Sequence, residues 1–165
     1  MGEASSGAAP SNQSPAGRMV TRVKPTRIAL LLTLAASCSP KPFVTHHDNG
    51  QLWEEVVMEK GHRNGSYRKF YESGAAEVAG SYVDGLRDGE WTWWYEDGTV
   101  ASRAVYQNGR RDGLWQTWHE NGQLKSEGRW EAGDRVGVWT EFDADGKQVG
   151  EHTWDAGTRT RMRRL

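Results

Sequence analysis

The chain has 165 residues, enough for one domain with extensions, and a formal net charge of −1. Its nine Trp, three Phe and 20 Gly favour flat aromatic surfaces joined by tight turns over a rounded aliphatic core. Residues 1–37 carry a charge of +3 and residues 38–165 carry −4, which argues against a nucleic-acid partner because such a partner requires a basic stripe. The single cysteine excludes an intramolecular disulfide.

The first part of the chain has the organisation of an exported protein. Residues 1–18 are small and polar, which predicts disorder, and we expect that they are a misassigned extension with translation starting at Met19. A basic segment and a short apolar run then give residues 19–37 the layout of a signal peptide, too short to span a membrane. The run that ends at Cys38 resembles a bacterial lipobox, with Ala35 where Leu is usual.

The resemblance to a lipobox implies that Cys38 is lipidated and becomes the mature N-terminus. Its acyl chains would form a stable membrane anchor, and Ser39 resembles the residue found at this position in lipoproteins of the outer membrane. The alternative is a cysteine at the end of an ordinary cleaved signal. Residues 38–48 are expected to be a tether. The His-His-Asp run at residues 46–48 lacks the frame of a metal site, and no metal or other cofactor is expected.

Residues 49–157 repeat with a period of 24 and without insertion or deletion. An internal period of this length indicates a repeat architecture. Pairs that are mostly Asn-Gly or Asp-Gly predict a tight hairpin turn in each unit, and a longer turn with two glycines four apart is expected between them. The repeated turn glycines are Gly74, Gly85, Gly89, Gly98, Gly109, Gly113, Gly122, Gly133 and Gly137.

The runs between these turns have the length of strands and are too short for helices. Because short turns make neighbouring strands antiparallel, the sequence predicts an all-β fold, an elongated single-layer antiparallel meander of about 4.5 hairpin repeats. We expect nine strands, at residues 51–59, 66–72, 75–83, 90–96, 99–107, 114–120, 123–131, 138–144 and 147–155.

Alternation along the longer strands predicts one aromatic face and one polar face. Gly80, Ala104 and Gly128 form a column of small residues that leaves room for an indole from the next strand. Trp91 and Trp94 are three residues apart, so either a bulge returns them to one face or the second face also carries aromatic side chains. The aromatic residues expected to build the array, and candidates for its binding surface, are Trp91, Trp94, Trp115, Trp118, Trp139, Phe142, Tyr82, Tyr106, Trp130 and Trp154.

One pattern recurs over residues 49–157: Gly-x-x-x-Gly-x-Trp-x-x-Trp/Phe, followed by Asn/Asp-Gly. It resembles the bacterial variant of the MORN repeat (membrane occupation and recognition nexus). The resemblance implies an elongated antiparallel sheet that acts as a scaffold, a dimerisation surface or a proposed lipid-binding surface. The bacterial variant is also often described as an antitoxin, which fits an exported lipoprotein poorly because such a protein would not meet a cytoplasmic toxin.

No motif in the sequence predicts an enzyme. No serine or cysteine motif accompanies His119, which is expected at the surface of a strand end. The run at residues 143–146 resembles part of a calcium loop, but His152 stands where the last ligand should be a Glu. The basic residues 158–165 are expected to be a solvated tail that protects the sheet edge, with contact to anionic lipid as the alternative.

The sequence therefore predicts a non-enzymatic scaffold or binding protein, anchored through Cys38 in the bacterial cell envelope, with an unidentified protein partner. Open sheet edges make a homo-oligomer a further expectation. Two alternatives stay open. The first is a cytoplasmic, antitoxin-like binding module in which residues 1–37 are retained. The second is a glycan-binding envelope module in which exposed Trp side chains stack on sugar rings.

Overall fold

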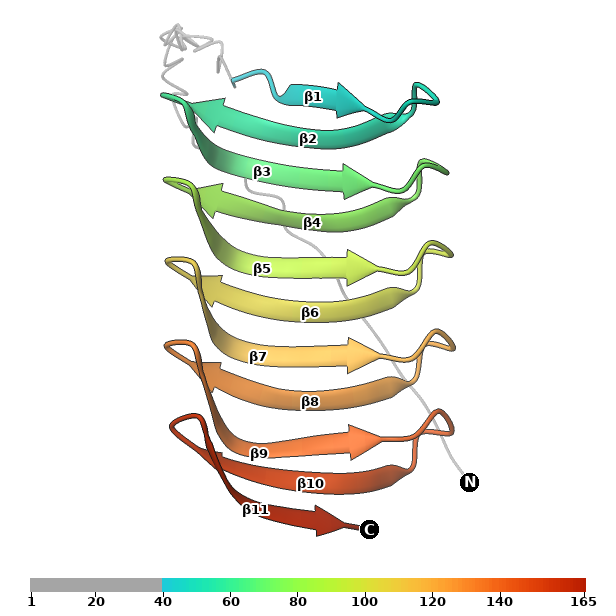
Figure 1. The fold of residues 1–165 in the computed structure, drawn as a ribbon, viewed down its shortest axis with the longest axis vertical. Helices are drawn as coiled ribbons and strands as arrows, with labels where there is room; N and C mark the ends of the chain where they lie inside the picture. Colours follow the sequence, from blue (N-terminus) through green and yellow to red (C-terminus); the bar gives the residue numbers. More distant parts are fainter. Residues whose placement is uncertain (1–39) are drawn as a thin grey trace, which may run out of the picture. The chain divides into compact units, whose positions relative to one another are not determined.

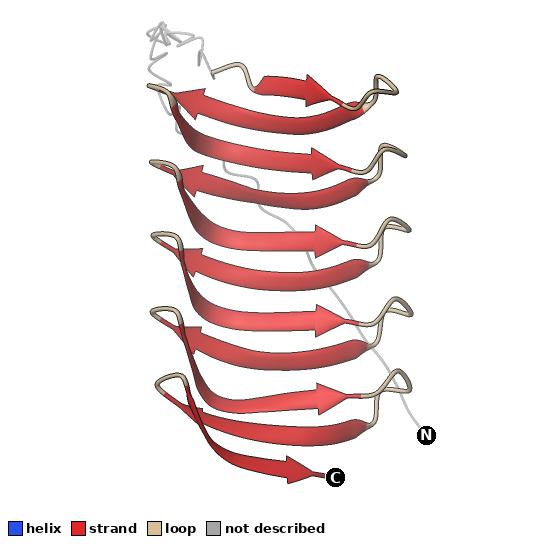
Figure 2. Ribbon diagram, viewed as in Figure 1, coloured by secondary structure: helices blue, strands red, loops and turns tan. Residues whose placement is uncertain are grey.

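The computed structural model describes residues 40–165, which form one antiparallel sheet and no helix (Figure 1, Figure 2). The strands lie side by side in the order of the sequence, so the fold is the predicted all-β meander. Within residues 40–165 no helix has the length and apolar character of a membrane span. The strands are β1 (Phe43–His46), β2 (Leu52–Glu59), β3 (His62–Phe70), β4 (Ala76–Val83), β5 (Leu86–Trp94), β6 (Val100–Gln107), β7 (Arg110–Trp118), β8 (Leu124–Glu131), β9 (Asp134–Phe142), β10 (Gln148–Asp155) and β11 (Thr158–Arg164).

The prediction of nine strands was two short. β1 lies in the segment expected to be a tether, and β11 lies in the segment expected to be a basic tail. β1 pairs with β2 and β11 pairs with β10, so each outer strand has one partner and one open edge. The repeat pattern missed both strands because they lie outside the complete repeats. In β11, for example, Arg161 occupies the repeat position of Gly137.

The turns that precede β3, β5, β7, β9 and β11 are tighter than the sequence predicted. Each has two residues at positive φ, as at Asp84 (49°) and Gly85 (81°), which is the geometry of a two-residue type I′ hairpin. Gly89 lies inside β5 with φ 73°, opposite the register shift between Ala79 and Ser81. The predicted longer turn was wrong: it is a short turn followed by a bulged strand, and β5 therefore starts four residues earlier than expected.

The Asn/Asp-Gly turns at the other end of the strands are wider, and only their glycines have positive φ. Before β6, the Tyr95 N–H donates to the Thr99 carbonyl at 2.8 Å and the Gly98 N–H donates to the Tyr95 carbonyl at 3.0 Å. The Asp97 carboxylate accepts a hydrogen bond from the Thr99 N–H at 2.7 Å. The acidic residue before the glycine therefore stabilises the turn through its side chain.

Side chains from the wide turns connect successive repeats. The Tyr95 hydroxyl donates to the Trp118 carbonyl at 2.8 Å, and Tyr71 makes the same bond one repeat earlier. One repeat later, the imidazole Nε2–H of His119 donates to the Phe142 carbonyl at 3.0 Å. His119 therefore lies at a strand end, as expected, and is in addition a half-buried member of this hydrogen-bond ladder.

The core lies on one face of the sheet, where indoles of β5 and β9 pack on small residues of β4 and β8. Trp91 is 0% exposed, and a Cβ added to Gly80 would collide with its indole. Trp139 covers Gly128 in the same way, which confirms at Gly80 and Gly128 the prediction that a small residue leaves room for an indole. The main buried cluster contains Val56, Tyr67, Val78, Tyr82, Trp91, Ala104 and Tyr106.

Candidate functional site

A column of arginines crosses the aromatic face at 24-residue intervals. It consists of Arg63, Arg87, Arg111 and Arg135, which lie near the starts of β3, β5, β7 and β9. Each arginine carbonyl accepts a hydrogen bond from a tight-turn glycine of the next repeat, as in the 2.9 Å bond from the Gly109 N–H to Arg87. The column was not predicted because these positions were assigned to long turns, although their period can be read from the sequence.

The guanidinium groups of this column lie against aromatic side chains. The Cζ atom of Arg87 is 4.4 Å from the ring centroid of Trp91 and 5.4 Å from that of Tyr106. The Cζ atom of Arg135 has similar distances, 4.5 Å to Trp139 and 4.9 Å to Trp154. Because a cation is attracted to the face of an aromatic ring, these contacts orient the arginines on the face.

The local environment raises the pKa of Arg63 and Arg87. Burial alone would lower the pKa of Arg87, but contacts of its guanidinium with the hydroxyls of Tyr82 and Tyr106 outweigh this effect and raise the pKa. The Nη1 group of Arg87 donates to the Tyr106 hydroxyl at 3.3 Å. The pKa of Arg63 is also raised against the effect of burial, here by the Tyr82 hydroxyl and the Glu54 carboxylate. The face is therefore positively charged wherever no carboxylate neutralises an arginine.

A depression of about 330 Å³ opens on this face over β5, β6 and β7. Its charged residues are Arg87 and Arg111, and no acidic residue lines it. The other lining residues are the aromatic Trp93, Tyr106 and Trp115 and the small Ser102, Ala104 and Thr117. This combination of two cations, aromatic walls and hydroxyl groups suits a ligand that carries a negative charge.

The second face of the sheet also carries aromatic side chains. Thr117 lines the depression, whereas the next residue, Trp118, contacts Arg103, whose Cζ atom lies 5.7 Å from its ring centroid. Arg103 itself precedes Ala104, another residue of the depression, so it faces the opposite side of the strand. Trp115 and Trp118 therefore lie on opposite faces.

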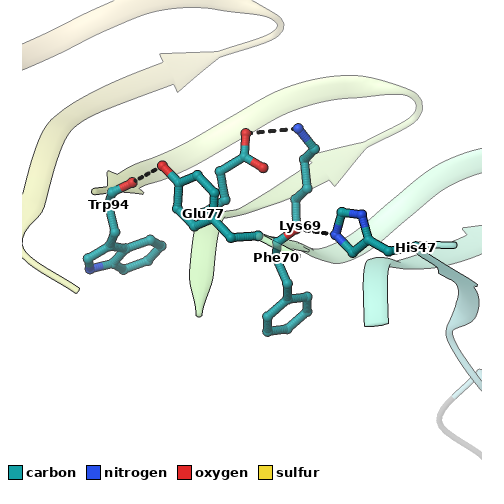
Figure 3. A network of polar contacts seen from close by, with 6 residues as sticks. His47, Lys69, Phe70, Glu77 and Trp94 are labelled. Carbon is teal, nitrogen blue, oxygen red and sulfur yellow. Dashed lines mark hydrogen bonds and ion pairs between the residues drawn. The ribbon is translucent and has the colours of Figure 1, made fainter. Parts of the chain in front are cut away.

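The same arrangement holds earlier in the array. Figure 3 shows the rings of Phe70 and Trp94 on one side of the sheet. The side chains of Lys69 and Glu77 lie on the other side, where they form an ion pair at 2.8 Å (Figure 3). Of the two alternatives that the sequence left open, the structure supports the second, with aromatic residues on both faces.

The predicted aromatic residues and turn glycines all lie within residues 40–165. Cys38 lies outside the described residues. Residues 40–165 contain no group of three His, Cys, Asp or Glu side chains arranged to hold a metal ion. On the aromatic face, Tyr82, Trp91, Tyr106 and Trp139 are buried and Trp115, Trp130 and Trp154 are half-buried, whereas Trp94, Trp118 and Phe142 are half-buried members of the other column. The repeated glycines all have positive φ, with Gly89, Gly113 and Gly137 inside strands and the others in turns.

Comparison with protein families identifies two units of this sheet. Residues 87–108 and residues 111–132 each match the model described as MORN repeat variant. The first matched segment covers β5 from Arg87 onward and β6, and the second covers β7 from Arg111 onward and β8. Together they contain all the residues that line the depression. A search of curated proteins gave no match. The chain therefore contains at least two adjacent repeats of this kind, and the candidate site lies within them.

Proposed function

We propose that the sheet is a non-enzymatic platform that binds another protein, and that an acylated Cys38 holds it at the bacterial cell envelope. MORN repeats indicate a repeat-containing binding or scaffold protein and are generally non-catalytic. The observation that carries the proposal is the depression between Arg87 and Arg111, which opens on a regular hydrogen-bonded sheet. Arginine and aromatic side chains contribute much of the binding energy at protein interfaces.

The cellular location is proposed from the sequence of residues 19–38. A basic segment, an apolar run and a cysteine follow one another there in the order found in lipoprotein signals. An acylated cysteine would attach the sheet to a membrane through residues 39–42. The array itself then needs no apolar surface for anchoring, and its arginine face stays accessible to a partner.

Membrane fractionation and intact mass measurement test the location. The natural chain and a Cys38→Ala variant would be expressed in a bacterial host. We expect the natural chain in the membrane fraction with an acylated Cys38 at its N-terminus, and the variant outside that fraction. A soluble natural chain that retains residues 1–37 would contradict the location and favour the cytoplasmic, antitoxin-like alternative.

Site-specific photo-crosslinking in the same host tests the platform. A photoreactive amino acid at position 117 would face the depression, and the same group at position 103 would face the other side of the sheet. We expect a discrete protein adduct from position 117 and none from position 103. Retention on cell-wall glycan without any protein adduct would favour the glycan-binding alternative.

A further inference from the structure

Equivalent arginines in the first and third repeats of the array have different neighbours. In the first repeat, Arg63 of β3 forms an ion pair with Glu54 of β2, with Nη2 and Oε1 3.0 Å apart. The Glu54 side chain is 15% exposed. The guanidinium of Arg63 also donates to the Tyr82 hydroxyl at 3.2 Å. The chain thus supplies its own carboxylate to this member of the column.

Two repeats later, the residues at these positions are Arg111 and Ser102. Both line the depression. A serine side chain ends where that of Glu54 continues to its carboxylate, so the third repeat has open space where the first repeat has an internal anion. Within residues 40–165, neither Arg111 nor Arg87 forms an ion pair.

We propose that the depression binds a carboxylate group from an acidic segment of a partner protein. The carboxylate would lie beside Arg111, in the place that Glu54 occupies beside Arg63, with Arg87 as a second cation. Guanidinium groups bind carboxylates through charge-assisted hydrogen bonds that are often bidentate. This inference rests on the proposed function and specifies the chemistry that a protein partner must present.

The aromatic side chains of the depression suit the rest of such a segment. Trp93 and Trp115 flank the arginines and offer apolar surface to the backbone and side chains next to the bound acid. A volume of about 330 Å³ lies at the small end of the range for ligand sites and has room for one or two side chains. The site would therefore recognise a short acidic segment.

Tryptophan fluorescence of the full chain can measure binding of a tetraglutamate peptide. We expect a saturable change with tetraglutamate and none with tetraglutamine. Arg111→Gln should weaken binding by about tenfold or more, because it removes a charge-assisted hydrogen bond. Arg103→Gln makes the same charge change on the opposite face and should leave binding within about twofold of the natural chain.

A Ser102→Glu substitution provides a sharper test. We expect it to form the internal ion pair of the first repeat with Arg111, to preserve folding and to weaken tetraglutamate binding by about tenfold or more. Unchanged binding in this variant or in Arg111→Gln would overturn the proposal, as would an equal loss in Arg103→Gln. If Ser102→Glu does not fold, Arg111→Gln decides the outcome.

Two further ligands distinguish the source of the negative charge. Inorganic phosphate and glucuronate should each bind at least about tenfold more weakly than tetraglutamate, because phosphate has no apolar surface for the aromatic walls and glucuronate has only one carboxylate for the two arginines. Equal or tighter binding of phosphate or glucuronate would overturn the assignment to an acidic protein segment. The protein-binding platform and the carboxylate site can be contradicted independently. A protein adduct from position 117 that persists in Ser102→Glu would support the platform and contradict the carboxylate site.

Discussion

Two neighbouring repeats place the same indole in different environments. In one, Trp91 of β5 lies over Gly80 of β4 and is completely buried. In the next, Trp115 of β7 pairs directly with Ala104 of β6, stays half-buried and forms a wall of the depression. The two pairs occupy equivalent positions and differ in the residue beneath the indole, although Trp91 also contacts the rings of Tyr67 and Tyr82 and Trp115 that of Trp139.

A single methyl group contributes to this difference. A Cβ at position 80 would collide with the Trp91 ring, so an indole cannot occupy that place over Ala104. The strand pairing also differs between the two repeats. The register shift lies between Ala79 and Ser81 where β4 pairs with β5, and between Ala104 and Tyr106, one residue later in the repeat, where β6 pairs with β7. The residue in the small-residue column therefore limits how closely an indole can pack on the sheet.

Removal of the indoles should show the largest difference between the two repeats. Trp91→Ala removes a fully buried side chain and should lower the free energy of unfolding by about 3–5 kcal/mol. Trp115→Ala removes a half-buried side chain and should cost only about 1–2 kcal/mol. Urea unfolding followed by far-UV circular dichroism measures both. Equal losses would show that the two indoles contribute equally and would break the comparison.

A methyl group added under Trp91 should give the next largest effect. Gly80→Ala places a Cβ within the present position of the indole and should destabilise the fold by about 1–3 kcal/mol through overpacking. The emission of Trp91 should also shift towards that of an exposed indole. Gly128→Ala is a matched second test because Trp139 covers that position. Unchanged stability in both variants would contradict the methyl explanation.

The periodic part of the fold could be predicted from the sequence. A fixed 24-residue period, turn glycines and strand-length runs together specify an antiparallel meander. The turn types could not be assigned, because the sequence shows two glycines, Gly85 and Gly89, without showing that the first closes a hairpin and the second bends a strand. β1 and β11 escaped prediction because a strand at the sheet edge needs pairing with one neighbour and not a complete repeat.

The candidate site was only partly predictable. Its aromatic members, such as Trp115 and Tyr106, stood out as columns, but Arg87 and Arg111 were assigned to loops and were not weighed as a group. The depression itself depends on the methyl of Ala104 and on the missing acid at Ser102. A repeat pattern records only what the repeats have in common, so it does not show these two differences. Their effect on the depression follows from how the side chains pack.

Loss of one ladder hydrogen bond should affect stability moderately. Tyr95→Phe removes the hydroxyl that donates to the Trp118 carbonyl and so connects the repeats of Trp91 and Trp115. We expect a loss of about 1 kcal/mol, with tetraglutamate binding unchanged, because the ladder lies at the wide turns. Chemical unfolding and the fluorescence titration measure the two quantities. A lost binding signal would show that the ladder, and not the residue under Trp115, shapes the depression.

Removal of the methyl at position 104 should change stability only slightly and yet close the depression. Ala104→Gly costs about 0.5–1 kcal/mol of chain entropy, which burial of the Trp115 indole offsets in part. We expect stability within about 1 kcal/mol of the natural chain and lower access of a soluble quencher to Trp115. Unchanged quenching would show that another contact holds Trp115 away from β6.

Val56 and Tyr67 pair at the positions that Gly80 and Trp91 occupy one repeat later. Ionisation of Tyr67 should affect the stability of the fold only in alkaline solution. Burial, with a contribution from the Glu54 carboxylate, raises the pKa of Tyr67 from its ordinary value of 10.0 to about 12. As the pH rises above 10, the unfolded chain loses this proton first, so the folded state holds more protons and its stability falls until the pH passes about 12. Stability at neutral pH should not depend on this proton.

Tyr67→Phe should remove this part of the alkaline loss of stability, which unfolding curves at a series of pH values measure. An identical dependence of the free energy of unfolding on alkaline pH in both proteins would show that Tyr67 does not titrate as a buried phenol.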